Sequence, residues 1–180
     1  MRTRAPRSRP LLATLVTLLP ALAVVAGCAP AFDGATYRGQ GVAFRVGPVP
    51  PTWRRLDANG AALAFRDDAK DTTVGVNARC GVDGDDVPLG ALTQHLFLHF
   101  TDRQSVKEEV VPFDGREALH SVVSAKLDGV AKTFDVWVLK KDGCVYDLYA
   151  ISPPADAAAG AAPFERFVHG FTTQVSPHAD

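Results

Sequence analysis

The chain has 180 residues, with 19 basic and 20 acidic side chains and 47% hydrophobic residues. That length fits one domain with its own core, and the lack of a basic block argues against a nucleic-acid partner. No internal repeat is visible, so an architecture of stacked repeats is not expected.

The first 27 residues predict a signal peptide for export. An apolar run covers residues 11–25, and four arginines stand before it, namely Arg2, Arg4, Arg7 and Arg9. As a helix this run would extend about 22 Å, which is short of the ~30 Å hydrocarbon core of a bilayer. A basic start, a short apolar stretch and then small residues are typical of a cleaved signal rather than of a spanning or buried helix. Removing the signal leaves 15 basic and 20 acidic residues, a net charge of −5.

The cysteine at position 28 predicts a lipid anchor. The stretch Val25-Ala26-Gly27-Cys28 resembles the bacterial lipobox, in which the cysteine becomes the first residue of the mature chain and is acylated. The alternative is a chance cysteine near an ordinary cleavage site. Several acyl chains, at about 0.8 kcal/mol per buried CH₂, hold a protein on a membrane almost permanently. We therefore expect Cys28 to carry a covalent lipid, with the membrane as partner and no other cofactor.

The residue after the lipobox bears on location in the cell envelope. Ala29 follows the cysteine, where an aspartate would resemble the inner-membrane retention signal of bacteria with two membranes. The periplasmic face of the outer membrane is therefore favoured, if the organism has two membranes. Residues 28–40 are small and polar and contain proline and glycine, so we expect a lipidated N-terminus and flexible tether there. A single globular domain is expected over residues 41–176.

The domain begins with a weak strand at 41–46, and alternating apolar and polar residues predict six more. The clearest alternation places Val74, Val76 and Ala78 on one face of a strand. Asp128-Gly129 and Asp142-Gly143 are hairpin signals between later strands. We expect these further strands at residues 61–66, 72–80, 105–112, 116–127, 130–141 and 144–152.

Two helices are predicted from apolar residues three or four positions apart. The first spans residues 88–101 and the second closes the domain. Tight hairpins force antiparallel pairing, and helices at both ends of the run of strands must cover the sheet. The sequence therefore predicts an α+β domain, an antiparallel β-sheet of about six to seven strands covered by helices as an α/β/α-type sandwich. The apolar stripes are Leu89, Leu92, Leu96 and Phe100 in the first helix and Phe164, Phe167, Val168 and Phe171 in the second.

The order of elements resembles the PsbP-like family, which groups the extrinsic subunit P of photosystem II with the Mog-type Ran-binding proteins. The resemblance rests on a strand with Phe44, the following Pro51-Thr52-Trp53, the helix after the third strand, the Asp-Gly hairpins and the closing helix. It covers most of residues 41–175. It implies an antiparallel sheet between helices and a role as an accessory or binding subunit. No residue of this chain matches a photosystem-binding or Ran-binding motif.

Two cysteines remain once Cys28 is assigned. Cys80 ends a predicted strand and Cys144 begins another, each in line with the apolar face of its strand. In an oxidising envelope such a pair forms a disulfide, and the alternative is two buried free thiols that behave as small apolar groups. We favour the bridge between Cys80 and Cys144.

Two candidate metal sites are weak. His95 and His99 lie four residues apart on the predicted helix and share a face, but no glutamate stands between them in the HExxH manner. We interpret them as histidines at the boundary of the apolar stripe. The acidic run Asp83-Gly84-Asp85-Asp86 lacks the spacing of an EF-hand, and acidic residues before a helix are explained by its positive N-terminal end. We therefore expect no bound metal.

Catalytic motifs are also lacking in the sequence. There is no G-x-S-x-G, GxGxxG or Walker A sequence. His120 and Ser121 are neighbours on a strand and face apart, as are Glu108 and Glu109, so neither pair forms a catalytic dyad. Four aromatic residues on or near the predicted strands could line a pocket or a docking surface. Packing in the core explains them equally well. These candidate pocket residues are Trp53, Trp137, Tyr146 and Tyr149.

Two functional hypotheses follow, and neither is an enzyme. An enzyme is the third interpretation, and convergent polar side chains in a deep cleft would be needed to favour it. The first is a non-catalytic accessory or interaction lipoprotein of the cell envelope, whose domain is presented to a protein partner at the membrane. The second is a binding module for a small apolar or lipid-like ligand held between sheet and helix. A flat exposed aromatic patch would favour the first hypothesis, and an apolar cavity would favour the second.

Overall fold

The computed structural model describes residues 31–81 and 87–174. These residues form eleven β-strands and two α-helices, joined by short turns. The strands are β1 (Ala31–Phe32), β2 (Thr36–Gly39), β3 (Val42–Arg45), β4 (Trp53–Leu56), β5 (Leu63–Asp67), β6 (Thr72–Cys80), β7 (Thr101–Phe113), β8 (Arg116–Leu127), β9 (Val130–Lys141), β10 (Cys144–Ser152) and β11 (Thr172–Gln174), and the helices are α1 (Leu89–Leu96) and α2 (Ala157–His169).

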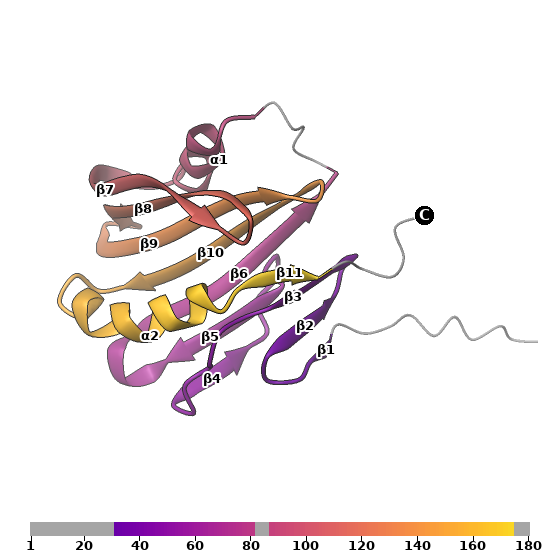
Figure 1. Ribbon diagram of the computed structural model, residues 1–180. Helices are drawn as coiled ribbons and strands as arrows, with labels where there is room; N and C mark the ends of the chain where they lie inside the picture. The colour runs from indigo at the N-terminus through magenta and orange to yellow at the C-terminus, as the bar shows by residue number, and fades with distance from the viewer. Residues whose placement is uncertain (1–30, 82–86, 175–180) are drawn as a thin grey trace, which may run out of the picture.

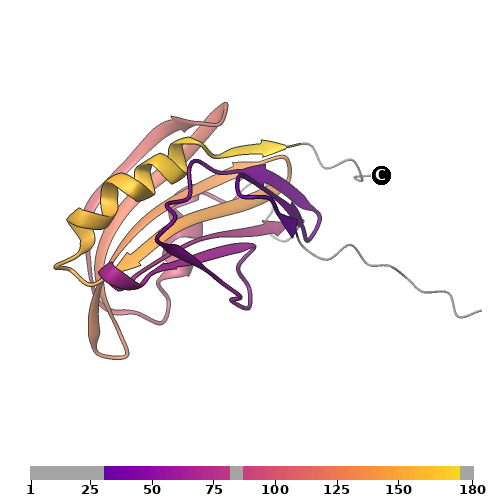
Figure 2. The same ribbon diagram turned by 90° about the horizontal axis from the view of Figure 1, so that it is seen from below.

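The strands form two antiparallel sheets (Figure 1). The larger sheet has seven strands in the order β4-β5-β6-β10-β9-β8-β7, and the smaller has four in the order β1-β2-β3-β11. Helix α2 and the smaller sheet lie on one face of the larger sheet, while α1 packs against β8 and β9 on the other (Figures 1 and 2). Strand β7 is an edge strand, and nearly all its residues are exposed.

Three Asp-Gly turns set the register of the larger sheet from β7 to β10. In each turn both residues have positive φ, as with Asp128 at 50° and Gly129 at 80°. Two-residue turns of this kind match the right-handed twist of the strands they join. The turn therefore fixes Leu127 opposite Val130, and every pair further along β8 and β9 follows from it. The other two turns are Asp114-Gly115 and Asp142-Gly143.

Two apolar cores lie on opposite faces of the larger sheet. The larger core joins that sheet to α2 and the smaller sheet, and Phe44, Phe164 and Phe167 are completely buried in it. The smaller core lies under α1, where Leu92 and Phe97 pack on strand residues. Aromatic rings link the layers of the larger core, since Phe44 contacts both Tyr146 of β10 and Phe171 beyond α2.

The observed architecture corrects the predicted α+β fold class. Strands hold 55% of the described residues and helices 17%, so the domain is mostly β. The predicted single sheet of six to seven strands under helices is instead two sheets, and the strand with Phe44 belongs to the smaller one. Helix α1 is shorter than predicted, because the chain leaves the helix after Leu96 and β7 already begins at Thr101.

The domain also starts earlier than predicted. Residues 31–40 were expected to be part of a flexible tether, but they contain β1 and β2. Tyr37 is only 1% exposed and stacks on Phe44, with ring centroids 5.0 Å apart. The small and polar composition hid these strands, because each is too short to show alternation.

Asp114 joins the hairpin between β7 and β8 to the end of the chain. Its carboxylate accepts hydrogen bonds from the backbone N–H of Thr173 at 2.9 Å and the hydroxyl of Thr172 at 2.7 Å. Lys141 Nζ lies 2.8 Å from the same carboxylate. Burial raises the pKa of Asp114, but hydrogen bonds from Lys141, Thr173 and Thr172 outweigh it and leave that pKa below its ordinary value of 3.8.

Replacing Asp114 with asparagine is expected to lower the free energy of unfolding by about 2 kcal/mol at neutral pH, because it removes the charge that these donors require. The native pKa lies below the unfolded one, so this stabilisation is complete above about pH 4 and is lost as pH falls through the native pKa. Urea unfolding at several pH values measures the difference. Asp128→Asn, at the matching position of the next hairpin turn, is the control and should change stability by less than about 0.5 kcal/mol. An equal loss in both variants would contradict the prediction.

Candidate functional site

A cleft of about 290 Å³ lies between α2 and the larger sheet. On the helix side its wall is formed by Ala157, Gly160, Ala161 and Phe164, which share one face of α2. The first three carry at most a methyl group, so the first two turns of the helix leave space above the sheet. Phe164 is fully buried and closes the cleft toward the core.

The sheet side of the cleft is mostly apolar or hydroxyl-bearing. Val122 of β8 and Ala150 of β10 form its floor, and the hydroxyls of Thr72, Thr133 and Ser152 lie around them. Lys107, His120 and Asp135 also line the cleft. The cleft therefore combines an apolar wall of small residues with one charged region.

The charged region is centred on His120. Its Nε2 lies 2.8 Å from Asp135 Oδ1, and its Nδ1 lies 3.5 Å from Glu109 Oε1. The ring stacks on Trp137 with centroids 4.2 Å apart and an angle of 18° between the planes. Only 7% of the His120 side chain is exposed.

Strand register brings these groups together. Glu109 of β7 lies opposite His120 of β8, and His120 lies opposite Trp137 of β9. Asp135 is two residues from Trp137 on the same strand and so shares its face. A hydrogen bond from Lys107 lowers the pKa of Glu109, and the charges of Lys107 and His120 act in the same direction.

In this arrangement the ring nitrogens of His120 face carboxylates rather than a nucleophile. A histidine acting as a general base needs one ring nitrogen directed at the hydroxyl or thiol that it deprotonates. Both nitrogens of His120 instead face carboxylates, of Asp135 and of Glu109. The cluster is suited to hydrogen bonding with the polar end of a ligand whose remaining part contacts the small residues of α2.

The strand faces follow the prediction, but this cluster was not predicted from the sequence. His120 and Ser121 do face apart, since Ser121 lines a cavity on the α1 side with Glu108, while Glu109 meets His120. The sequence information needed to predict the cluster was the position of the Asp-Gly turns. Counting back from Asp128-Gly129 pairs Val122 with Asp135, which makes His120 and Asp135 diagonal neighbours on one face.

The four aromatic candidates do not gather at one site. Trp53, Trp137 and Tyr146 are at most 8% exposed and belong to the larger core. Tyr149 lies on the opposite face, against the smaller core. Burial raises the pKa of Tyr149, and the negative charge of Asp147 adds to that effect. The structure therefore places these side chains in packing positions on two different faces.

The cysteines and histidines are placed as follows. Cys80 and Cys144 are register partners on β6 and β10, and a disulfide joins them. His95 and His99 are both exposed, and α1 ends before His99, so the two rings do not share a helical face. Among residues 31–81 and 87–174, no group of three side chains is placed to hold a metal ion.

Two predicted features fall outside the described residues. These are the lipidation site Cys28 with the signal before it, and the acidic run at 83–86. Neither helix of the described part is long and apolar enough to cross a membrane.

Comparisons with known proteins show the fold. No protein-family model matches the sequence, and no curated protein matches it. The solution structure of cyanobacterial PsbP (CyanoP) from Synechocystis superposes with a TM-score of 0.55 at 13% identity, covering 83% of this chain and 99% of that one. LpqN of Mycobacterium tuberculosis, described as involved in cell envelope biogenesis, has a TM-score of 0.54 at 16% identity, covering 81% of this chain and 90% of that one. The PsbP-like fold inferred from the order of elements is therefore confirmed.

A third solved structure agrees with this fold. A protein of Bacteroides thetaiotaomicron superposes with a TM-score of 0.53 at 15% identity, covering 79% of this chain. This chain spans about half of that protein, with 49% covered. At these levels of identity the likeness shows how the backbone is arranged and leaves function to be argued from the site.

Proposed function

We propose that this chain is a lipid-anchored protein of the bacterial cell envelope whose domain binds a small apolar or lipid-like ligand without catalysing a reaction. The cleft under α2 is the observation that supports an apolar or lipid-like ligand. Its volume, about 290 Å³, is at the small end of the range of ligand pockets, which are mostly apolar with few polar groups. The small residues of α2 would contact the apolar part of the ligand, and the His120 cluster would bind its polar end.

The sequence supports a lipid anchor at Cys28. An arginine-rich start, a short apolar run and Val25-Ala26-Gly27-Cys28 support export and acylation at Cys28. The fold is compatible with this setting, because LpqN, which shares it, is described as involved in cell envelope biogenesis. A mature chain anchored through Cys28 would hold the cleft near a membrane, where lipid-like ligands are concentrated.

The non-catalytic part of the proposal is supported by the geometry of His120. Its Nε2 is hydrogen-bonded to Asp135 at 2.8 Å and its Nδ1 faces Glu109 at 3.5 Å, and the sequence carries no nucleophile motif. An accessory protein that presents its domain to a protein partner is the second candidate. The exposed edge strand β7 favours it, because Val106 and Val110 are 67% and 57% exposed there.

Filling the cleft is expected to abolish ligand binding. In Ala161→Leu the larger side chain enters the space between α2 and the sheet, and leucine keeps the helical propensity of alanine. Ala162→Leu, one residue further on the exposed side of α2, is the matched control. We expect native mass spectrometry of the full chain, purified in a neutral detergent, to show at least a tenfold loss of co-purified ligand in the first variant only.

The same spectra test the anchor. A mass that corresponds to an acylated chain starting at Cys28 is expected, and an unacylated mass would refute the anchor. Ligand retained in Ala161→Leu would show that the cleft is not the binding site. A stoichiometric membrane protein in place of a ligand would support the accessory role instead.

A further inference from the structure

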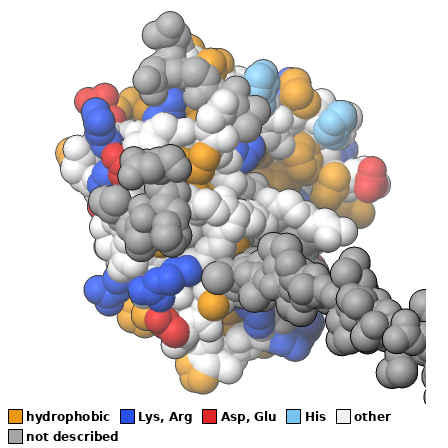
Figure 3. Space-filling model, turned by 90° about the vertical axis from the view of Figure 1, so that its right-hand side faces the viewer, with side chains coloured by type: hydrophobic (Ala, Val, Ile, Leu, Met, Phe, Trp, Pro, Cys, Tyr) orange, Lys and Arg blue, Asp and Glu red, His pale blue; other side chains and the backbone are white. Residues whose placement is uncertain are grey.

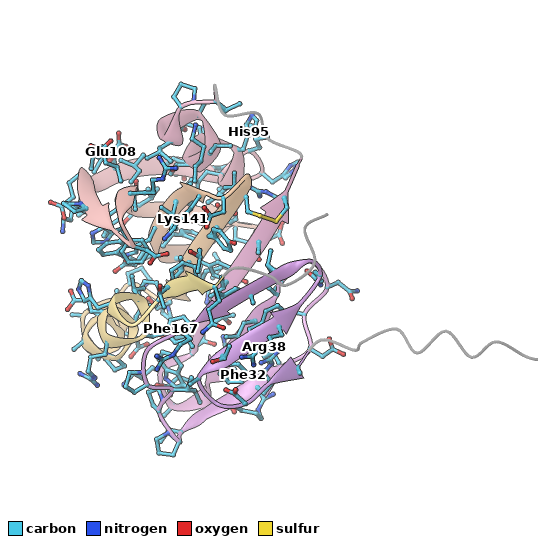
Figure 4. All side chains as sticks on the ribbon, turned by 45° about the vertical axis from the view of Figure 1, so that its right-hand side comes forward. Phe32, Arg38, His95, Glu108, Lys141 and Phe167 are labelled. Carbon is cyan, nitrogen blue, oxygen red and sulfur yellow. A yellow bond between two sulfur atoms is a disulfide. The ribbon has the colours of Figure 1, made fainter. Side chains whose placement is uncertain are left out.

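A second cavity, of about 360 Å³, lies beside the smaller sheet. Tyr37 and Gln40 contribute from the hairpin of β2 and β3, and Arg55 contributes from β4. The rest of its wall is the loop between β4 and β5, with Leu56 and Ala64 from the two strands. Figure 4 shows Phe32 and Arg38 on the neighbouring strands β1 and β2, close to the start of the described chain.

Arg55 is held in place at this cavity with most of its donors unused. Its guanidinium lies 5.3 Å from the ring centre of Phe32 and 5.5 Å from that of Phe65, which is cation–π geometry. Of its five N–H donors, one makes a long hydrogen bond of 3.5 Å to the carbonyl of Ala62. Within the described ranges, no carboxylate lies within 4.0 Å of it. The adjacent Arg54, in contrast, forms two hydrogen bonds to Asp68.

The hydroxyl of Tyr37 is a second unused group at the same cavity. Tyr37 is 1% exposed, and its oxygen has no hydrogen-bond partner among residues 31–81 and 87–174. Leaving a buried hydroxyl without a partner is costly, so a ligand atom at this position would be favourable. Burial raises the pKa of Tyr37, and the positive charge of Arg55 acts in the opposite direction.

We propose that this cavity binds a phosphate group, with Arg55 supplying its guanidinium fork and Tyr37 its hydroxyl. Arginine pairs with phosphate through two parallel hydrogen bonds, and a phosphate oxygen can accept a third from a tyrosine. Asp57 also lines the cavity and its negative charge acts on Arg55, but among the described ion pairs none joins the two side chains. Figure 3 shows Lys and Arg side chains, together with acidic ones, on the lower part of this face of the molecule.

The position of the cavity favours a phospholipid headgroup as the source of the phosphate. Phe32, which packs under Arg55, is in the strand that begins at Ala31. Ala31 is three positions after Cys28, a distance of at most about 11 Å along an extended chain. The lipid source rests on the proposed acylation of Cys28, whereas the phosphate pocket does not. A free phosphate ester has the same binding chemistry.

The test uses the full chain in a neutral detergent and two phosphate probes. Glycerol 3-phosphate is titrated by calorimetry, and dioleoyl phosphatidylglycerol is added to mixed micelles and counted by native mass spectrometry, with dioleoylglycerol as the lipid without phosphate. We expect Arg55→Gln to weaken binding at least tenfold and Tyr37→Phe about threefold. Arg54→Gln removes the same charge from the next residue and should change binding less than twofold.

The binding of the two probes to the variants distinguishes a lipid headgroup, a free phosphate ester and no phosphate site. Saturable binding of phosphatidylglycerol with this pattern of variants supports a lipid headgroup, and equal binding of glycerol 3-phosphate supports a free phosphate ester in the same pocket. Equal weakening in Arg54→Gln and Arg55→Gln, or no saturable binding of either probe, would overturn it. Tyr37→Phe should unfold at the same temperature as the unchanged chain or higher, because it removes an unpaired hydroxyl, so lost binding there is not lost folding. An unacylated Cys28 would remove the argument for a lipid source only.

Discussion

Replacing Gly47 with alanine is expected to lower the free energy of unfolding by about 3–5 kcal/mol, among the largest effects of any single substitution in the domain. A Cβ on Gly47 would lie 1.9 Å from the backbone oxygen of Arg166 in α2. The atom it meets is backbone, so no side-chain rotation can relieve the overlap. The whole C-terminal turn of α2 would have to move away from the strand exit.

That movement would disturb more than one contact. The backbone N–H of Gly47 donates to the carbonyl of Phe167 at 2.8 Å, and Gly170 lies so close that a Cβ there would meet the Cα of Gly47 at 2.3 Å. Phe167 is fully buried in the larger core, so shifting α2 would also open a cavity there.

Denaturant unfolding of Gly47→Ala checks this prediction, and Gly90→Ala is the control. A Cβ on Gly90, in α1, would meet no atom within 4 Å, so that substitution should stabilise the helix by about 0.5–1 kcal/mol. Similar stability of Gly47→Ala and the unchanged protein would show that α2 is not fixed by this close approach.

Removing the disulfide between Cys80 and Cys144 is expected to cost about 4 kcal/mol. The two cysteines are 64 residues apart in sequence, and cross-linking a loop of that size removes much conformational entropy from the unfolded chain. The bond joins β6 to β10 at the centre of the larger sheet. The loop it closes contains α1 and the strands β7, β8 and β9.

The double variant Cys80→Ala with Cys144→Ala should unfold at lower denaturant concentration and should be unaffected by reducing agent. The unchanged protein should lose the same stability when it is reduced. A reduced protein as stable as the oxidised one would mean that strand pairing alone holds β6 to β10, and would contradict the prediction.

Sequence patterns located the long strands of the larger sheet well. The predicted strands at 72–80, 116–127, 130–141 and 144–152 have the observed bounds. Each is at least nine residues long, so alternation is visible, and an Asp-Gly turn marks where one strand ends and the next begins. Local chemistry decides these elements, and tertiary contacts only confirm them.

Most of the smaller sheet could not be predicted in the same way. The predicted weak strand at 41–46 corresponds to β3, but the other three strands have only two to four residues, which is too short for a pattern. Tyr37 becomes a strand residue because the larger sheet and α2 bury it, and no neighbour in sequence signals that burial. Trp53 begins a strand, β4, for the same reason, since it packs on Phe65 and Phe167. Tertiary packing overrides weak local preference here.

The candidate site was only partly accessible from sequence. His120, Glu109 and Asp135 could have been brought together by counting along the hairpins, because strand register is set by the turns. The cleft itself could not, because it exists where side chains are small. Ala157, Gly160 and Ala161 carry no chemistry that singles them out, and an unfilled space between two elements is a property of packing.

The pairing of β11 with β3 also determines the order in which the domain can fold. The last described strand hydrogen-bonds to one of the first, and Phe164, Phe167 and Phe171 complete a core whose other side is built from Phe44. The larger core is therefore complete only when residues near both ends of the described chain have come together. Such long sequence separation between contacting residues slows folding.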